Sequence, residues 1–165
     1  MPGAACKAVS ALGRPGGADM DYTSAFAISA SGMAVERTRL EVIALNLANA
    51  GSTRAGGVLY QPLAVIAAPR PPSAFAELMA GYGAGALPSG AQVVEVRPTG
   101  ALPRLVHDPG HPDADARGYV AYPGVDPVHE MIGMLQATRA YEANVAALNA
   151  ARTMALRALD IGGAQ

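Results

Sequence analysis

The sequence has little of what most enzymes and nucleic-acid-binding proteins are built from. Tryptophan is absent, and the chain has only six tyrosines and two phenylalanines. Twelve basic and thirteen acidic residues leave a formal net charge of −1, so no basic excess favours binding to a nucleic-acid backbone. The single cysteine, Cys6, excludes an internal disulfide bond and a cysteine-based metal site. No run of about 18 apolar residues occurs, so no membrane-spanning helix is predicted.

The apolar residues that are present are mostly small. Hydrophobic residues make up 51% of the 165-residue chain, and many of them are alanines, each of which buries little area. This length suits one domain, or one domain with helical extensions. Because bulky side chains are few, a thick core is not expected. Helices rich in alanine instead bury their surface by lying close against other helices.

Residues 1–20 form a leader rich in Gly, Pro and Ala, which we expect to be disordered. Lys7 and Ser10 interrupt its apolar stretch, so a cleaved signal peptide is not expected. Met20 follows directly and is a candidate for the true start of translation. On that hypothesis Cys6 is a translation artefact, and an N-terminal peptide that begins upstream of Met20 excludes it.

A long helix is predicted over residues 23–49. Asp21, Thr23 or Ser24 can cap its start, because their side-chain oxygens accept the unpaired first-turn N–H groups. Gly32 costs about 1 kcal/mol relative to Ala, which is tolerable where another backbone approaches. A coiled-coil seam follows alternating steps of three and four residues: Phe26, Ala30, Met33, Arg37, Leu40, Ala44 and Leu47.

A second apolar row lies roughly 200° around the same helix, at Ile28, Val35 and Val42. An ordinary surface helix has one apolar stripe. Two rows on nearly opposite sides predict neighbours on both sides of the helix.

A second long helix is predicted over residues 127–161. Asp126 is the predicted N-cap, Pro127 suits the first helical position, and Gly162-Gly163 supplies the stop. At 1.5 Å per residue each helix is on the order of 40–50 Å long, too long for the small middle region to cover. The two seams must therefore be covered by each other or by other subunits. The second seam is Met131, Met134, Thr138, Tyr141, Val145, Leu148, Arg152, Ala155 and Leu159.

The region between the helices holds most of the prolines. Short β-like runs occur at residues 58–65, 92–96, 102–106 and 118–121, and 81–90 is predicted to be a flexible loop. The predicted fold is mainly α with a small β module: long terminal helices that pair as an antiparallel-type coiled coil, and a loop-rich β-containing middle. The predicted segments are 21–53, 54–125 and 126–165.

Several polar residues are open to two interpretations. His107, Asp108, His111, Asp113 and Asp115 suit a metal or acid–base site, but the Pro and Gly among them favour an ordered turn. Arg37 and Arg152 lie in the seams, where they either lay their stems along a partner and reach water or bind carboxylates of a neighbouring helix. Asn46 and Asn49 are expected to bond backbone near the helix end, with a contact between subunits as the alternative.

Several motifs resemble those of the flagellar rod, hook and hook-associated proteins, the rod/hook axial family. The first helix carries the similarity at Asp21–Met33, Glu36–Leu40 and Asn46–Ala50. The segments His107–Val120, Glu130–Val145 and Leu148–Ala151 narrow it to the proximal-rod members, not their longer distal-rod and hook relatives. The motif asparagines are Asn46, Asn49, Asn144 and Asn149.

The resemblance implies a structural subunit of the basal-body rod in the periplasm, with no catalysis, cofactor or metal. It implies export through the flagellar type III apparatus without a cleaved signal. The implied partners are the chain itself, other rod subunits and nearby basal-body components, with no nucleic acid and no insertion into a membrane. The terminal helices would form an inner tube, with a small β-containing domain outside.

We expect the subunit contacts to lie on the helix rows. The terminal segments would stay largely disordered alone and become ordered on docking. A charge at Val35 should then block rod assembly while leaving expression and export largely intact. The expected contact residues are Phe26, Ile28, Met33, Val35, Leu40, Val42 and Leu47, together with Met131, Met134, Tyr141, Val145 and Leu148.

Without the resemblance, two further classes remain open. A coiled-coil adaptor predicts a stable, defined dimer with ordered helices in dilute solution. A small hydrolase predicts that His107→Ala and Asp108→Ala abolish function while assembly persists. The opposed apolar rows at the chain ends favour an assembly protein over both.

Overall fold

The computed structural model describes residues 22–53, 57–74, 77–78 and 90–162. Two long helices dominate it, α1 (Tyr22–Asn49, 28 residues) and α3 (Pro127–Gly162, 36 residues). Both predicted helices are confirmed, with bounds within one residue of those expected. The leader and the proposed Asp21 cap lie outside the described residues, as do positions 81–89 of the predicted loop.

Local hydrogen bonds explain where α3 begins and where α1 ends. Asp126 caps α3 as predicted, because its Oδ1 accepts the N–H of Val128 at 3.0 Å and its carbonyl accepts the N–H of Glu130 at 3.0 Å. After α1, both the N–H and the hydroxyl of Ser52 bond the carbonyl of Asn49, at 3.0 and 2.8 Å. The chain therefore turns immediately after the last helical residue.

In the described part of the chain, four strands form two separate antiparallel pairs. β1 (Leu63–Pro69) pairs with β2 (Ala91–Pro98), and β3 (Arg104–His107) pairs with β4 (Tyr119–Tyr122). The β1–β2 register shifts between Ile66 and Ala67. The prediction of a strand over 58–65 is wrong at its start, because strand pairing begins only at Leu63. The residues just before β1 contact α1 instead of pairing as a strand, because the Tyr60 hydroxyl donates a hydrogen bond to Asn46.

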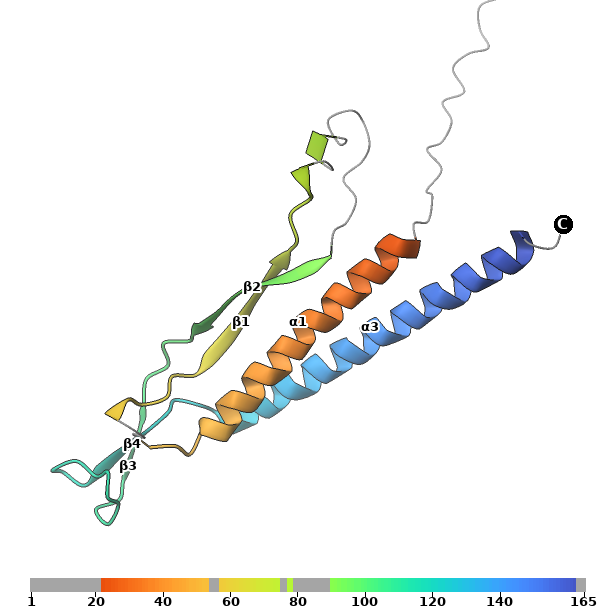
Figure 1. Cartoon of the computed structure of the whole chain (residues 1–165). Coiled ribbons are helices and arrows are strands. Elements are labelled where there is room, and N and C mark those ends of the chain that lie inside the picture. Colours follow the sequence, from red (N-terminus) through yellow and green to blue (C-terminus); the bar gives the residue numbers. More distant parts are fainter. Residues whose placement is uncertain (1–21, 54–56, 75–76, 79–89, 163–165) are drawn as a thin grey trace, which may run out of the picture.

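The elements are arranged around α1 (Figure 1). α3 runs antiparallel along one side of α1, and the β1–β2 pair contacts α1 on another side. The β3–β4 pair lies at the end where α1 finishes and α3 begins. α1 therefore has structured neighbours on two sides. These sides are not the two predicted rows, because Gly32 and Ile43, which meet α3, belong to neither row, and Ala30, Arg37 and Ala44 of the first row are exposed.

The core is thin and built from small or medium side chains. The buried hydrophobic residues, all 7% exposed or less, are Val35, Val42, Ile43, Val120, Ala137 and Ala151. Two buried serines of α1, Ser29 and Ser31, and one buried asparagine, Asn46, lie beside them. With so little bulk available, close approach of backbones must supply much of the packing.

Candidate assembly surface

The contact between α1 and α3 depends on glycines that leave room for side chains of the other helix. A Cβ added at Gly32 would lie 2.8 Å from Asn144 Oδ1, and one added at Gly133 would lie 3.3 Å from Ile43 Cδ1. Asn46 and Glu130 pair in the same register. Because the helices are antiparallel, each step toward the C-terminus of α1 matches an equal step toward the N-terminus of α3. Gly32 thus admits the Asn144 side chain, where we had expected a backbone.

Asn46 joins three parts of the chain. It is 1% exposed, and its Nδ2 donates to the Leu63 carbonyl and to Glu130 Oε1, both at 2.9 Å. Its Oδ1 accepts the Tyr60 hydroxyl at 2.8 Å and the Leu63 N–H at 2.9 Å. All four hydrogen-bonding positions of the amide are therefore filled. Asn46 therefore bonds backbone as expected, through the N–H and carbonyl of Leu63, but these partners and the side chains of Tyr60 and Glu130 lie on other segments.

The environment of Asn46 also affects Tyr60. Burial raises the pKa of the Tyr60 hydroxyl, and the negative charge of Glu130 raises it further. The hydroxyl thus stays protonated and remains a donor to Asn46.

Two of the three members of the Ile28/Val35/Val42 row are buried within the single chain. Val35 and Val42 are 5% and 6% exposed. Next to this row, the Ser31 hydroxyl accepts the N–H of Ala91 at 3.0 Å, at the start of β2. Gly90 lies so close that an added Cβ would collide with Ser31 Oγ. We expected a charge at Val35 to act between subunits, but the structure places this side chain in the packing of the subunit itself.

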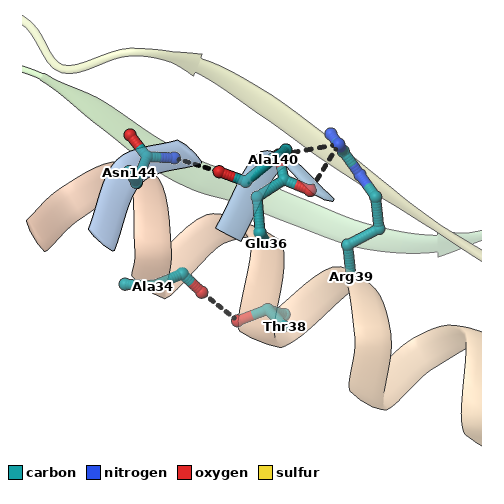
Figure 2. A network of polar contacts seen from close by, with 6 residues as sticks. All are labelled: Ala34, Glu36, Thr38, Arg39, Ala140 and Asn144. Carbon is teal, nitrogen blue, oxygen red and sulfur yellow. Dashed lines mark hydrogen bonds and ion pairs between the residues drawn. The ribbon is translucent and has the colours of Figure 1, made fainter. Parts of the chain in front are cut away.

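Polar groups continue along the helix pair (Figure 2). On α1, Arg39 Nη1 binds both carboxylate oxygens of Glu36, at 2.8 and 2.9 Å, and the Glu36 side chain is 13% exposed. On α3, Asn144 Nδ2 donates to the Ala140 carbonyl at 2.9 Å (Figure 2). Asn144 thus lies over Gly32 with its amide held by its own helix.

The remaining predicted contact residues lie at intermediate or exposed positions. Met131 is 57% exposed and Tyr141 is 38% exposed. On α3 the buried positions are the alanines at 137 and 151, not the larger side chains of the predicted seam. The half-buried members are Phe26, Ile28, Met33, Leu40, Leu47, Met134, Val145 and Leu148.

The other motif residues have local roles. Asn49 Nδ2 donates to the Leu45 carbonyl at 2.8 Å, the backbone bond near the helix end that we expected. Asn149 is exposed. Arg37 pairs with Glu41 of its own helix at 3.0 Å, with both side chains more than half exposed, and Arg152 is also exposed. Among the residues that the structure describes, Arg37 therefore pairs with a carboxylate of its own helix and with none of a neighbouring helix.

The His/Asp segment between β3 and β4 is an ordered turn, as predicted. Asp108 Oδ1 accepts the N–H of Gly110 at 3.2 Å, and Asp115 Oδ1 accepts the N–H groups of Arg117 and Tyr119 at 2.8 and 2.9 Å. The bonds from Tyr119 and then Arg117 lower the pKa of Asp115. These carboxylates thus hold backbone N–H groups.

Proteins of known name match the chain over most of its length. It is 36% identical over 141 residues to the flagellar basal-body rod protein FlgC of Bacillus subtilis, an alignment that covers 82% of this chain and 94% of that protein. The chain belongs to the FlgC family of flagellar basal-body rod proteins. It is also 38% identical over 151 residues to FlgC of Escherichia coli O157:H7, covering 87% of this chain and 99% of that FlgC.

The similarity extends to distant bacteria and to a separate family model. FlgC of Aquifex aeolicus is 36% identical over 133 residues, covering 79% of this chain and 89% of the Aquifex protein. Residues 116–161 match the model described as "Flagellar basal body rod FlgEFG protein C-terminal", a stretch that contains nearly all of α3. As a member of the FlgC family, the chain is a structural component of the basal-body rod and not an enzyme.

No helix in the described part of this FlgC family member is both long and apolar enough to cross a bilayer.

Proposed function

We propose that the chain is a subunit of the proximal rod and polymerises through α1 and α3 into the axial drive shaft needed for motility. This proposal rests on apolar side chains of the helix pair that stay exposed because they take no part in the contact between α1 and α3. Along α3 alone, Val128, Ile132, Leu135, Leu156 and Leu159 are each 49% exposed or more. Apolar positions of this density are typical of a surface that another subunit covers.

The helix pair is proposed to act as a coiled-coil-type unit in the assembled rod. The constant register of Gly32–Asn144, Ile43–Gly133 and Asn46–Glu130 supports this interpretation. Residues 21–53 and 126–165 would form the inner part of the rod, and 54–125 the outer part. The partners are other copies, the neighbouring rod subunits and nearby basal-body components.

Export through the flagellar type III apparatus, without a cleaved signal, belongs to the same proposal. A chain with a thin core suits passage in an unfolded state, because little buried area must be given up. Ordering on assembly then concerns the surfaces that lack a partner within the subunit. We expect the last turns of α3 to gain order on docking and the Asn46 end of the pair to be ordered already.

Complementation tests the proposed function. The gene is deleted from its host, and the full chain or a chain ending at Val125 is supplied. We expect only the full chain to restore swimming and to be found in purified basal bodies. Normal swimming with the shortened chain would contradict polymerisation through both terminal helices. Blotting of cell and periplasmic fractions controls for expression and export.

Circular dichroism separates this function from that of a soluble adaptor. The helix content of the full chain is measured in dilute solution and at concentrations where it assembles. A chain of residues 54–125, which lacks both helices, is measured for comparison. We expect helix content to rise on assembly of the full chain. A full chain that is already a compact, fully helical monomer would contradict ordering on assembly, and a stable dimer of fixed size would favour the adaptor.

A further inference from the structure

The β3–β4 pair is attached to the rest of the molecule differently from the β1–β2 pair. α1 holds β1 and β2 through buried side chains, Asn46 at Leu63 and Ser31 at Ala91. Among the described helices and strands, β3 and β4 pack against each other and against no other element. The position of this pair relative to α1 therefore depends on the connecting segments and on the side-chain bonds that those segments make.

One such bond joins the end of α1 to the turn between β3 and β4. The Thr53 hydroxyl donates to Asp113 Oδ2 at 2.6 Å, across 60 residues of sequence. Thr53 directly follows Ser52, whose bonds to the Asn49 carbonyl end α1. We call the Thr53–Asp113 hydrogen bond the latch, because it ties the turn to the end of the helix pair.

A histidine side chain holds the acceptor of the latch in place. His111 Nδ1 accepts the N–H of Asp113 at 3.1 Å, so this nitrogen carries no proton in this arrangement. The same nitrogen lies 4.0 Å from Asp113 Oδ2, the oxygen that binds Thr53. The backbone of His111 is fixed on both sides, because its N–H donates to the Asp108 carbonyl at 3.3 Å and its carbonyl accepts the Ala114 N–H at 3.1 Å. A change in the charge of the ring therefore acts first on Asp113.

We propose that the charge of His111 controls the latch: the neutral ring keeps it closed, and the protonated ring opens it. Histidine is the side chain that ordinarily gains a proton between about pH 8 and about pH 5. A proton on Nδ1 removes the acceptor for the Asp113 N–H and turns this nitrogen into a charged donor. The charged donor draws Asp113 Oδ2 away from the Thr53 hydroxyl, because an ionised donor strengthens a hydrogen bond to a carboxylate.

The other charged and titratable groups around His111 affect when it gains the proton, not what the proton does. From β4, the Tyr122 ring meets the His111 ring edge to face, with 6.5 Å between the centroids. From β3, the Arg104 guanidinium lies over the same tyrosine, 5.7 Å from its centroid, and its positive charge opposes protonation of His111. On the turn itself, the Asp108 carboxylate binds a backbone N–H two residues on. Asp113 is the group that meets both the His111 nitrogen and the latch.

An NMR titration of the full chain from about pH 8 to about pH 5 tests the latch. This range stays above about pH 4, where carboxyl groups ordinarily titrate. We expect the His111 ring, the Asp113 amide and the Thr53 methyl group to shift with one common midpoint. The three-bond couplings of Thr53 should report a single side-chain rotamer at the high pH and an averaged one at the low pH. A ring charge that acts only at a distance would not change the rotamer.

Two substitutions on the turn test the roles of the ring and the carboxylate. His111→Gln stays uncharged at every pH, so the Thr53 and Asp113 signals should no longer depend on pH in this range. Asp113→Asn keeps an acceptor for the Thr53 hydroxyl but has no charge to attract the protonated ring. Thr53 should then keep its single rotamer at the low pH.

The matched control is His107→Gln, which removes the other histidine of the β3–β4 pair. The His107 ring lies against Tyr119, 5.1 Å between centroids, on the face of the pair opposite to Tyr122. This substitution should leave the Thr53 midpoint unchanged. A Thr53 midpoint that follows His107 would contradict control by His111.

Thr53→Val imitates the open latch at every pH, because valine has nearly the same shape and no hydroxyl. At the high pH, the Gly51 and Ser52 amide signals of this chain should resemble those of the unaltered chain at the low pH. Thr53 signals that ignore the His111 midpoint, a midpoint that survives His111→Gln, or a rotamer that stays single at the low pH would each overturn the proposal.

The control of the latch goes beyond the proposed function and does not rest on it. The titration uses the dissolved chain alone, so its outcome leaves the complementation result untouched in either direction. The consequence of the proposal is that acid loosens the link between the end of α1 and the β3–β4 turn. The orientation of the β3–β4 pair relative to the helix pair is then less fixed as the pH falls.

Discussion

Asn46 of α1 donates a hydrogen bond to the carboxylate of Glu130 on α3, 2.9 Å away, at the end of the helix pair where the chain turns into the β-containing region. The same amide holds both backbone polar groups of Leu63, the first residue of β1. One buried side chain therefore fixes the position of α3 and of the β1–β2 pair relative to α1. This end of the molecule is expected to be its most rigid part.

Asn46→Ala should destabilise the isolated chain strongly. The change leaves Glu130 and both polar groups of Leu63 without this partner at a part-buried site. Because each buried unsatisfied group costs about 1–3 kcal/mol, we expect a loss of roughly 3 kcal/mol in the free energy of unfolding. Urea denaturation followed by circular dichroism measures it.

Asn49→Ala is the matched control for Asn46→Ala. Its side chain bonds one carbonyl of its own helix in an exposed setting, so its loss should cost less than about 1 kcal/mol. Equal effects of the two substitutions would show that Asn46 does not join the three segments in solution.

Gly32→Ala should destabilise the helix pair although alanine is the better helix former. The added Cβ would lie 2.8 Å from Asn144 Oδ1 and 3.0 Å from its Cγ, so the Asn144 side chain must move. Alanine gains about 1 kcal/mol in helix propensity over glycine. We expect a net loss of about 1 kcal/mol, because the cost of repacking Asn144 exceeds that gain. Thermal unfolding of the purified chain measures the change.

Two further substitutions control for helix propensity at Gly32. Gly133→Ala meets only the end of the flexible Ile43 side chain, at 3.3 Å, and should be neutral or stabilise by up to about 1 kcal/mol. In an Asn144→Ala chain, Gly32→Ala should become stabilising as well. If the cost of Gly32→Ala stays the same without the Asn144 amide, the close approach of these two residues is not its cause.

The turn before β4 should lose stability in acid through Asp115. Backbone hydrogen bonds from Tyr119 and Arg117 lower the pKa of this carboxyl. Its contribution is therefore present above the unfolded pKa of about 4 and is lost as the pH falls through the lower folded value. We expect Asp115→Asn to lessen the acid sensitivity of the Arg117 and Tyr119 amide signals in an NMR titration. Asp108→Asn, which removes a carboxylate with a single backbone donor, should leave those two signals unchanged.

The helices and their ends could be predicted from sequence because local chemistry determines them. Asp126-Pro127 specifies the start of α3 through the cap on Val128, and no distant residue is needed for that bond. The start of β1 could not be predicted, because it depends on hydrogen bonds that Tyr60 and Leu63 donate to Asn46 of α1. These bonds join residues that are far apart in the sequence. Propensity for strand at 58–62 carries no information about that partner.

The helix contact was predicted to follow the large side chains, and the structure shows the opposite on α3. Gly133, Ala137 and Ala151 approach α1, while Met131 and Tyr141 lie toward the outside. Hydrophobic spacing favours bulky residues because they contribute the most area. The missed signal was the row of small residues at steps of three and four, which permits a close approach of two helices.

Val35→Asp should act on the subunit itself and not first on assembly. Val35 is 5% exposed within the single chain, so a carboxylate there would be buried without a partner. We expect a loss of at least about 3 kcal/mol in the free energy of unfolding, measured by urea denaturation of the purified chain. Leu45→Asp, on the same helix at a side chain that is 50% exposed, should leave unfolding nearly unchanged and reduce swimming in complemented cells if that side of α1 meets another subunit. A Val35→Asp chain that unfolds like the unaltered chain, yet fails to enter basal bodies, would show that the Ile28/Val35/Val42 row contacts other subunits after all.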